Sequence, residues 1–434
     1  MRRRTLISTL AVLPLVACAT QPSRGPTPTP RPGLFVDTTY NYGPISPFVR
    51  ASNTGPWQTL ALEHRTHSRD INLSMIRWPG GNWGDENSVT EWMVDEYIGL
   101  CRAVGAEPCI HVRLFGGTPS EAANLVNYVN VTKQYAVKFW AIGNEPDLFV
   151  KKRGAKRYNV ADYATDFVTY RQAMKQVDAT IIVMGPEISQ FDADEQYPVD
   201  ATGEPWLRGF LQRVTDIEMV SWHRYPFGGA PVSRTQLQQD PPEWVASVNK
   251  TREIMRQYLG RDVPIAITEA NSDWSGRVDR DTGTNSYANA LWWSDVITRL
   301  IQHRCEIIAH FCLGAIQAQG IGMFGPVSYN SEPLPIFESY RLVARLGDVL
   351  LHSHCDDPRL AFLATQTDAG KIVCHLVNQT DADVSLPFTI NGINATSAEV
   401  WWYSEGQTVT QRNNISLQDT VRCPARTAMV LELA

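Results

Sequence analysis

The chain is poor in charged residues. Asp, Glu, Lys and Arg together make up 19% of its 434 residues, against roughly 25% in an average soluble protein. The balance is acidic, with a formal net charge of −6. Because nucleic-acid binding relies on a basic face that neutralises phosphates, this composition argues against DNA or RNA as a partner. Hydrophobic residues reach 43%, enough to bury a substantial core, so general disorder is excluded.

Long hydrophobic runs are also missing. No segment beyond the N-terminus has 18 uninterrupted apolar residues, the length that a membrane-spanning helix needs. The best candidate, residues 307–324, contains His310, Gln317 and Gln319. We interpret it as a buried strand followed by a loop.

The N-terminus has the pattern of an export signal. Three arginines precede a short apolar stretch, residues 6–16, which is too short to span a bilayer permanently. The stretch ends Leu-Val-Ala-Cys at Cys18 and resembles a bacterial lipobox, in which the signal is cut before a lipidated cysteine. We expect a signal peptide at 1–18, a Pro/Thr-rich tether at 19–33, and an exported, membrane-anchored bacterial lipoprotein that faces the periplasm or the cell exterior. The alternative is an ordinary signal peptide with an incidental cysteine.

Cysteine is scarce, with eight in the whole chain. If Cys18 is lipidated, seven remain, so at least one thiol is free. In an exported protein, Cys101 and Cys109, or Cys305 and Cys312, could form local disulfides, but their spacing does not decide it. No Cys-x-x-Cys motif occurs, and no structural zinc site is expected.

Most of the chain alternates short apolar runs with amphipathic segments of helical length. Solid apolar runs are typical of strands buried on both faces, and strand–helix alternation favours a parallel sheet. We therefore predict an α/β fold with a (β/α)₈ TIM barrel over residues 34–346; a doubly wound sheet is the alternative. The eight runs that we take as strands are 34–36, 75–78, 109–114, 137–142, 181–184, 219–222, 265–268 and 307–311.

The last part of the chain has a different pattern. Short β-like runs follow one another, separated by turn sequences such as Asp-Ala-Gly at 368–370 and Asn-Gly at 391–392. We predict an all-β sandwich over residues 347–434. Its expected strands are 360–365, 372–377, 384–390, 398–402 and 428–433.

Two glutamates stand out at the ends of predicted barrel strands, where TIM barrels place their active sites. Glu145 and Glu269 each follow an apolar run, on the fourth and seventh strands. Carboxylates on these strands face each other across the barrel mouth, as hydrolysis of a glycosidic bond requires. The structural alternative is two surface or ion-paired glutamates. Asn144 before one of them, and His223 and Tyr225 between them, favour a functional pair.

These residues resemble a known group of enzymes. The Gly-Asn-Glu-Pro stretch at 143–146 resembles the acid/base motif of clan A glycoside hydrolases, which are retaining (β/α)₈ enzymes, and Thr-Glu-Ala-Asn at 268–271 resembles their strand-seven nucleophile. Within the clan, the motifs are closest to the heparanase/β-glucuronidase and the arabinofuranosidase/β-xylosidase families, in which a β-sandwich commonly follows the barrel, often joined by an N-terminal strand.

The resemblance implies a role for each matching residue. Glu145 would be the acid/base and Glu269 the nucleophile of a hydrolase that cleaves O-glycosidic bonds in oligo- or polysaccharides without metal or organic cofactor. Retaining enzymes hold these groups about 5–5.5 Å apart, and we expect the charge of Glu269 and partial burial to keep Glu145 protonated at first. Arg77 would also pair with the nucleophile, Asn144 would contact the 2-hydroxyl, and Tyr225 would orient the nucleophile. The expected substrate-binding residues are Arg77, His111, Asn144, His223, Tyr225 and Trp274.

The sequence departs from the clan at the eighth strand. Many members carry a tryptophan there, whereas this strand reads His-Phe-Cys-Leu-Gly at 310–314. Trp274, Trp83 or Phe324 could supply the stacking face for the sugar instead. Glu187 competes for a carboxylate role, and we interpret it as an accessory hydrogen-bonding group.

Other interpretations remain open from the sequence. Arg113 and Arg224 could contact an acidic sugar, but pairing with nearby acids is the favoured reading. A non-catalytic glycan-binding surface lipoprotein would need the two glutamates to fail to converge. A metal-dependent barrel hydrolase would need a ligand cluster at the strand ends, and a His-x-His motif is missing from the first strand. The sugar, exo or endo action and oligomeric state are not given by the sequence.

Overall fold

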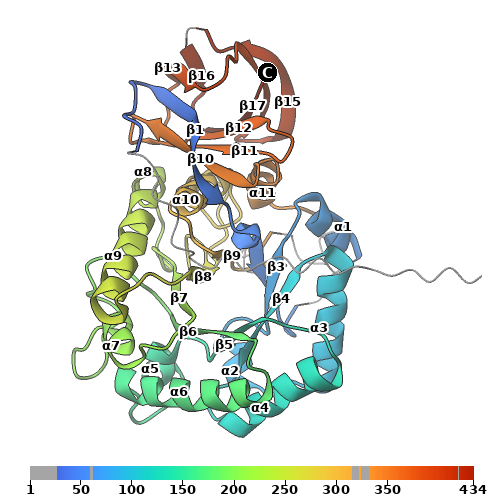
Figure 1. Ribbon diagram of the computed structural model, residues 1–434, viewed down its shortest axis with the longest axis vertical. Helices are drawn as coiled ribbons and strands as arrows, with labels where there is room; N and C mark the ends of the chain where they lie inside the picture. The colour runs from blue at the N-terminus through green and yellow to red at the C-terminus, as the bar shows by residue number, and fades with distance from the viewer. Residues whose placement is uncertain (1–26, 59–61, 315–321, 324–331, 419) are drawn as a thin grey trace, which may run out of the picture.

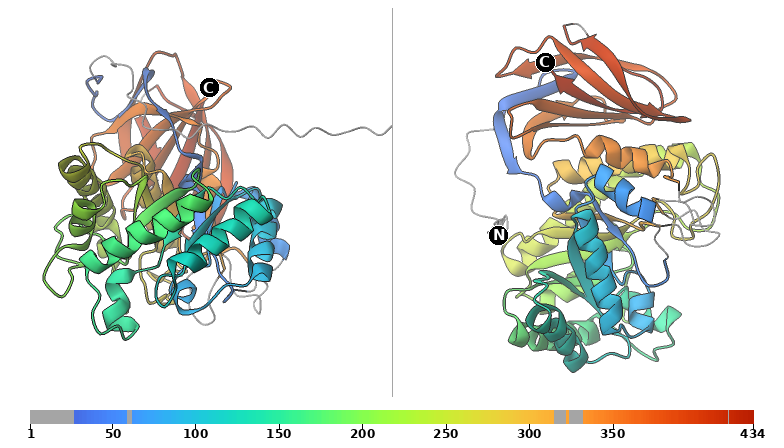
Figure 2. Two further views of the ribbon diagram at one scale, coloured as in Figure 1. Left: turned by 60° about the horizontal axis from the view of Figure 1, so that its bottom comes forward. Right: turned by 90° about the vertical axis from the view of Figure 1, so that its right-hand side faces the viewer.

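The computed structural model describes residues 27–58, 62–314, 322–323, 332–418 and 420–434. Two bodies are visible in Figure 1, a strand-and-helix barrel below and a β-sheet body above, and the right-hand view of Figure 2 shows the two stacked. The predicted signal peptide, Cys18 and most of the tether lie outside the described residues, as does Phe324.

The lower body is a closed parallel barrel of eight strands, which confirms the predicted TIM barrel. The strands pair in chain order, and the last one returns to the first, Ala51 lying opposite Ala309. All eight are buried along their length, except at the start of β4. The strands are β2 (Ala51–Asn53), β3 (Met75–Trp78), β4 (Glu107–Val112), β5 (Phe139–Ile142), β6 (Ile182–Ile188), β7 (Met219–Arg224), β8 (Ile265–Ala270) and β9 (Ile307–His310).

One predicted barrel strand belongs to the other body. β1 (Leu34–Pro44) pairs with β10 (Val349–Cys355) and β13 (Val384–Asn391) of the terminal sheet, so the expectation that residues 34–36 open the barrel is wrong. Its apolar side chains are buried in the core of that sheet. The true first barrel strand, β2, reads Ala-Ser-Asn and has no apolar run that periodicity could detect.

The helices cover the outside of the barrel, as the left-hand view of Figure 2 shows. α3 (Glu91–Val104) is capped at both ends: the Thr90 side chain accepts a hydrogen bond from the N–H of Met93, and Gly105 ends the helix with φ +80°. The others are α1 (Leu62–Asp70), α2 (Trp83–Glu86), α4 (Pro119–Val126), α5 (Phe149–Lys152), α6 (Val160–Val177), α7 (Trp206–Arg213), α8 (Arg234–Gln239), α9 (Pro241–Leu259), α10 (Tyr287–Gln302) and α11 (Ile336–Val343).

The terminal body is a nine-stranded sheet in the order β15-β14-β17-β12-β11-β10-β1-β13-β16. Side chains from both ends of this order share one apolar cluster, so the sheet curls around its own core as a sandwich does. The remaining strands are β11 (Leu360–Gln366), β12 (Ile372–Asn378), β14 (Ser397–Ser404), β15 (Gln407–Ser416), β16 (Thr420–Cys423) and β17 (Thr427–Leu433).

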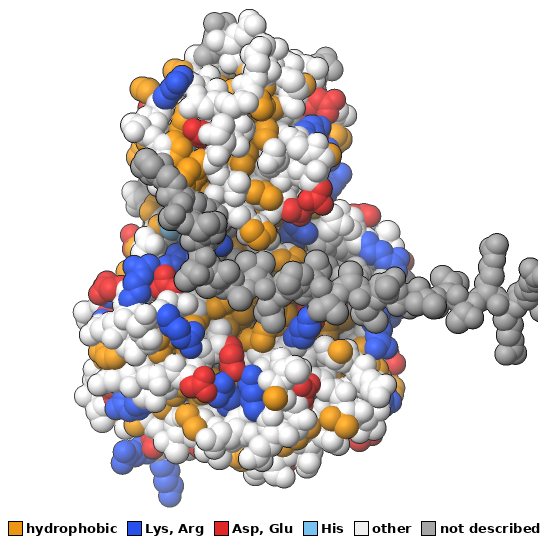
Figure 3. All heavy atoms as spheres, in the orientation of Figure 1, with side chains coloured by type: hydrophobic (Ala, Val, Ile, Leu, Met, Phe, Trp, Pro, Cys, Tyr) orange, Lys and Arg blue, Asp and Glu red, His pale blue; other side chains and the backbone are white. Residues whose placement is uncertain are grey.

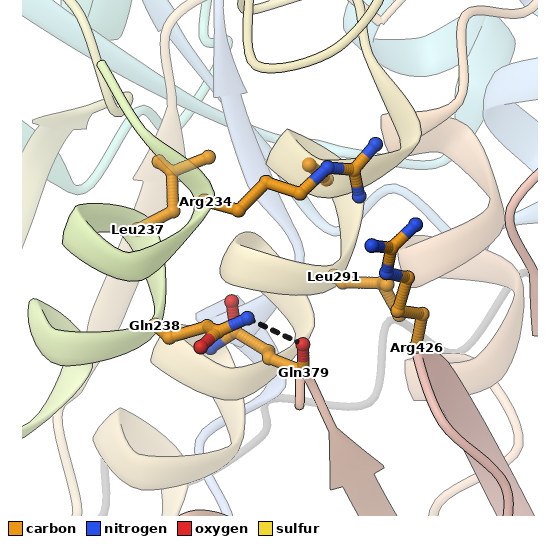
Figure 4. A pocket seen from close by; sticks show the side chains of 7 residues that line it. Arg234, Leu237, Gln238, Leu291, Gln379 and Arg426 are labelled. Carbon is orange, nitrogen blue, oxygen red and sulfur yellow. Dashed lines mark hydrogen bonds between the residues drawn. The ribbon is translucent and has the colours of Figure 1, made fainter. Parts of the chain in front are cut away.

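The outer face of this sheet packs on α10 and α11 of the barrel. Tyr403 lies in a buried apolar cluster there, and its hydroxyl lies 2.9 Å from Ser294 Oγ and 3.0 Å from Ser339 Oγ. Figure 4 shows a small pocket at this junction, with Arg234 and Arg426 along one side. Both guanidinium groups pair with Glu405. No candidate active-site residue lines the pocket.

Buried tryptophans account for much of the aromatic content. Six are among the largest fully buried side chains: Trp140, Trp206, Trp222, Trp244, Trp292 and Trp293. None of the seven cysteines within the described ranges forms a disulfide, so neither candidate local disulfide is present. No helix among the described residues is long and apolar enough to cross a bilayer.

Candidate active site

Glu145, which follows β5, and Glu187, near the end of β6, occupy matching positions at the mouth of the barrel. Both have left-handed backbones, with φ +51° and +56°, a conformation that bulky residues adopt rarely and mostly at functional sites. The N–H of Glu145 donates to the carbonyl of Glu187 over 2.9 Å. Two residues further along each turn, Asp147 accepts hydrogen bonds from the N–H and hydroxyl of Ser189, at 2.8 and 2.5 Å. The two turns are therefore held together twice.

Arg77, near the end of β3, joins two carboxylates and a side-chain amide. Its guanidinium is 1% exposed and donates to Glu269 at 2.8 Å, to Glu187 at 2.6 Å and to Asn144 at 2.9 Å. A buried arginine is tolerated only when acceptors surround it. Burial lowers the pKa of Arg77, but the negative charges of Glu187 and Glu269 raise it by more, so the net shift is upward. The guanidinium is therefore a permanent cation at the centre of the site.

Glu269, on β8, is fixed by donors at both carboxylate oxygens. Oε1 accepts from Arg77 and from the N–H of Gly81 at 3.0 Å, while Oε2 accepts from the hydroxyl of Tyr225 at 2.9 Å. Gly81 has φ +58°, which glycine adopts readily, and this conformation brings its N–H to the carboxylate. Burial and the charge of Glu269 hold the pKa of Tyr225 well above its ordinary value, so the hydroxyl remains a donor.

His223, on β7, is surrounded by three carboxylates. Its Nδ1 lies 3.3 Å from Glu145 and 3.7 Å from Glu269, and its Nε2 lies 3.5 Å from Glu187. Burial lowers the pKa of the imidazole, but Glu269, Glu145 and Glu187 together raise it to about 10. His223 is therefore a second cation at neutral pH, and with Arg77 it balances most of the negative charge.

The protonation of Glu145 differs from the expectation. Burial raises the pKa of its carboxyl, but the hydrogen bond and charge of His223, together with Lys152 and Arg153, lower it below the ordinary value. The prediction that the charge of Glu269 keeps Glu145 protonated is therefore wrong for this arrangement. The proton resides on His223, and the two groups titrate as a pair.

Asn144 and the Glu145 turn are positioned by a buried pair that the sequence did not reveal. Asp85, fully buried at the start of the β3–α3 connection, accepts from the N–H groups of Asn144 at 2.6 Å and Leu114 at 2.6 Å. Arg153 donates to Asp85 and to the carbonyl of Asn144, at 3.3 and 2.9 Å. Neither residue follows a strand directly, so reading the strand ends alone missed them.

Two of the predicted substrate-binding residues lie apart from this cluster. His111 is 2% exposed and packs against the backbone of Gly84, where an added Cβ would lie 1.8 Å from Nε2. Burial and Arg77 hold the pKa of His111 well below its ordinary value, so it is neutral. Trp274, in contrast, is 61% exposed in the β8–α10 connection, with its indole against Gly228. Trp83 is half-buried at the start of α2.

An aromatic side chain takes the place of the missing strand-eight tryptophan. Phe311, directly after β9, is half-buried and stacks on Trp57, with ring centroids 6.3 Å apart. Its edge approaches Tyr225 at 6.5 Å, and an added Cβ on Gly81 would lie 3.2 Å from its ring. Phe311 therefore lies beside two of the three groups that bind Glu269, Tyr225 and Gly81, a position the sequence analysis left unassigned.

The remaining charged candidates have structural partners. Glu187 is fully buried between Arg77 and the hydroxyl of Thr268, and Arg77 lowers the pKa of its carboxyl against the effect of burial, as expected of an accessory group. Arg224 pairs with Asp192 and Asp240, as the favoured reading held. Arg113 instead donates to Ser88 and to backbone carbonyls.

The closest-packed ligand-type atoms at the mouth come from Glu145, His223 and Glu269, which offer atoms within 4.8 Å of one another. Such a group could hold a cation in principle. Arg77 and protonated His223 already supply positive charge to it, so an added metal ion would have to displace the proton. The same spacing brings an oxygen of Glu145 within 4.8 Å of an oxygen of Glu269, near the separation of retaining rather than inverting glycosidases.

Comparison with known proteins finds glycoside hydrolases among the relatives of this chain, although no family model matches it. A β-xylosidase of Geobacillus stearothermophilus is 26% identical over 240 residues, which are 50% of this chain and 43% of that protein. Bovine heparanase is 26% identical over 226 residues, 50% of this chain and 37% of that protein. The chain thus matches less than half the length of these curated relatives.

Solved structures resemble the whole fold. An α-L-arabinofuranosidase of Thermotoga maritima, solved with arabinose, superimposes with a TM-score of 0.73 and 19% identity, over 92% of this chain and 99% of that one. A family 44 xyloglucanase of Paenibacillus polymyxa gives a TM-score of 0.71 and 15% identity, over 92% and 99%. The TIM barrel followed by a β-sandwich is therefore shown, and the resemblance to clan A glycoside hydrolases is confirmed in both sequence and structure.

Proposed function

We propose that this chain is a retaining glycoside hydrolase that cleaves O-glycosidic bonds in oligo- or polysaccharides by double displacement. The observation that carries the proposal is the convergence of Glu145 and Glu269, with carboxylate oxygens within 4.8 Å of each other. This spacing leaves room for one anomeric centre between a nucleophile and an acid, but not for an additional attacking water. A non-catalytic glycan-binding barrel would not need this convergence.

In the first step, Glu269 attacks the anomeric carbon and the bond to the leaving oxygen breaks. Arg77, Gly81 and Tyr225 hold Glu269 in place, so little reorganisation is needed as its charge passes into the new ester bond. The leaving oxygen receives the proton of the Glu145–His223 pair. Because Nδ1 of His223 lies 3.3 Å from Glu145, the proton reaches the sugar through the carboxyl.

In the second step, the roles of Glu145 reverse. Its carboxylate takes a proton from a water molecule, the water oxygen attacks the anomeric carbon, and Glu269 leaves as a carboxylate. The configuration of the sugar is retained after two inversions. The side-chain amide of Asn144 binds the 2-hydroxyl, and Arg77 and Asp85 hold this residue in position.

The test is a panel of nitrophenyl glycosides with the full chain: β-glucuronide, β-xyloside, β-glucoside, β-galactoside and α-L-arabinofuranoside. Hydrolysis of one of them by the wild type, lost in both Glu145→Gln and Glu269→Gln, supports the proposal. If the panel is silent, polysaccharide digestion tests for an endo-acting enzyme that needs a longer glycan. Product release that survives in Glu269→Gln contradicts the assignment.

We further propose that the chain is exported and anchored to a bacterial membrane through a lipid on Cys18. The support is the lipobox-like sequence and the Pro/Thr-rich tether that follows it. Labelling with a fatty-acid analogue in cells should mark the wild type and not Cys18→Ser. A wild type that is processed, unlabelled and found in the soluble fraction would indicate an ordinary signal peptide.

A further inference from the structure

A basic segment, most of whose cations lack an acidic partner among the described residues, follows the acid/base turn. Residues 151–157 read Lys-Lys-Arg-Gly-Ala-Lys-Arg and contain no acidic residue. Arg153 is committed to Asp85 inside the barrel mouth. Lys151, Lys152 and two further basic residues, Lys156 and Arg157, are exposed, and none of them pairs with a carboxylate within the part of the chain that the structure describes. Basic side chains project over the region of α5 and α6 in the space-filling view of Figure 3.

Arg153 lies over the ring of Phe149. Lys152, which is exposed, has an aromatic neighbour of its own. Its Nζ lies 5.9 Å from the ring centroid of Trp274. Trp274 is 61% exposed, although exposing a large apolar side chain to water is unfavourable. Its indole packs against Gly228, where an added Cβ would lie 1.7 Å from the indole nitrogen. A large aromatic face is thus exposed to solvent beside an exposed cation.

This pair lies outside the buried carboxylate cluster, with Lys152 close to the acid/base. Lys152 ends α5, seven residues after Glu145, and is near enough to lower the pKa of that carboxyl. Trp274 follows Glu269 by five residues. Its backbone N–H donates to the carbonyl of Phe227, which lies two residues beyond Tyr225. Groups beside the acid/base face the leaving group, because Glu145 must reach the leaving oxygen.

We propose that Trp274 and Lys152 form a leaving-group subsite for an anionic sugar residue, carrying a carboxylate or a sulfate. The apolar face of the sugar ring stacks on the indole, and its anionic group pairs with the Lys152 ammonium, while the neighbouring cations attract the chain as it approaches. This inference rests on the proposed function for its place in the reaction. It adds a substrate class that the barrel and the two glutamates do not specify.

Binding is measured by calorimetry, independently of hydrolysis, with galacturonate oligomers, sulfated chondroitin oligosaccharides and neutral xylo-oligosaccharides of matched length. The full-length wild type should bind at least one of the two anionic ligands more tightly than the neutral one, with an affinity that falls as salt rises. Lys152→Gln should weaken anionic binding about tenfold, the order expected for one lost charge-assisted contact. Trp274→Ala should weaken the binding of anionic ligands further.

The matched control is Lys151→Gln, which makes the same charge change one residue away from the Trp274 contact. It should weaken anionic binding much less than Lys152→Gln. Equal losses in the two lysine variants, or neutral oligosaccharides that bind as tightly as both anionic ones, would overturn the subsite. Because binding needs no turnover, a specific Lys152 effect in a protein that hydrolyses nothing would leave the subsite standing and contradict the proposed function instead.

Discussion

Nδ1 of His223 lies 3.3 Å from Oε1 of Glu145, and this contact stores a proton beside the group that must deliver one. The imidazole, with its pKa raised to about 10 by Glu269, Glu145 and Glu187 against the effect of burial, holds the proton at neutral pH. In the proposed mechanism, the carboxyl takes it when a leaving oxygen needs it, and the acid is then the pair and not Glu145 alone.

The first prediction concerns the pH dependence of stability. Because the folded pKa of His223, about 10, is above the ordinary value of 6.5, its charge stabilises the fold fully below pH 6.5, and this contribution is lost as pH rises toward 10. His223→Gln should therefore lower the free energy of unfolding by several kcal/mol more at pH 6 than at pH 10, measured by urea denaturation. A difference that grows with pH would contradict a cationic His223.

Arg77 should be the residue whose loss destabilises the site most. Arg77→Met leaves Glu187 and Glu269 buried without their cation, and breaking buried pairs in this way costs about 3–5 kcal/mol. The free energy of unfolding at pH 7 measures it. As a control, Arg359→Gln removes an exposed pair with Asp357 and should change stability by less than about 1 kcal/mol. Similar losses in the two variants would mean that the buried network is not formed.

Tyr225 should matter for rate and little for folding. Tyr225→Phe removes the donor to Oε2 of Glu269 and leaves Arg77 and Gly81 on the other oxygen. We expect kcat/KM to fall about 100-fold with the melting temperature nearly unchanged, since a preorganised donor of this kind contributes roughly 10²–10³ in rate. Tyr128→Phe, which removes a hydroxyl from Asp95 on the outer surface, is the control and should retain full activity.

Asp147 should shape the pH profile from behind Glu145. Burial and the nearby charge of Glu145 raise the pKa of the Asp147 carboxyl, and the hydrogen bonds from Ser189 lower it. The net result is a pKa of about 6, above the ordinary 3.8. A raised carboxyl pKa means that the fold loses stability as pH rises from about 4 to 6, so Asp147→Asn should gain stability over the wild type above pH 6.

The activity of the Asp147 variant gives an independent reading. Ionised Asp147 disfavours a negative Glu145, so removing the charge should move the alkaline limb of the kcat/KM profile to lower pH. Ser189→Ala keeps the charge and removes the hydroxyl donor, which should raise the pKa of Asp147 further. Unchanged pH profiles of kcat/KM in both variants would show that the Asp147–Ser189 contact only supports the backbone.

Sequence reasoning reached the barrel and its carboxylates because seven of the eight strands contain short apolar runs with polar residues at or near their ends. It failed at β2, whose Ala-Ser-Asn sequence carries no hydrophobic signal, and at β1, whose apolar residues do not reveal which sheet they join. Periodicity reports burial, and the choice of partner strand depends on contacts more than 300 residues apart, as between Leu34 and Cys355.

The sequence likewise predicted some of the site residues and missed others. Arg77, Asn144, His223 and Tyr225 were found because each stands at a strand end. Asp85 lies on the short helix α2 and Arg153 directly follows α5, where sequence spacing carries no information on which backbone amides a buried carboxylate will bind. The charge state of Glu145 also escaped prediction, because it depends on the imidazole that lies against it in three dimensions.

Chemical rescue of Glu269→Gly tests the central claim most directly. The variant is incubated with azide and the nitrophenyl glycoside that the wild type hydrolyses, and the product is analysed by NMR. If Glu269 is the nucleophile, the variant is inactive alone, and azide enters the vacated space to give a glycosyl azide of inverted configuration, because only one displacement occurs. Wild-type-like hydrolysis without azide, or an azide product of retained configuration, would contradict Glu269 as the nucleophile of a retaining enzyme.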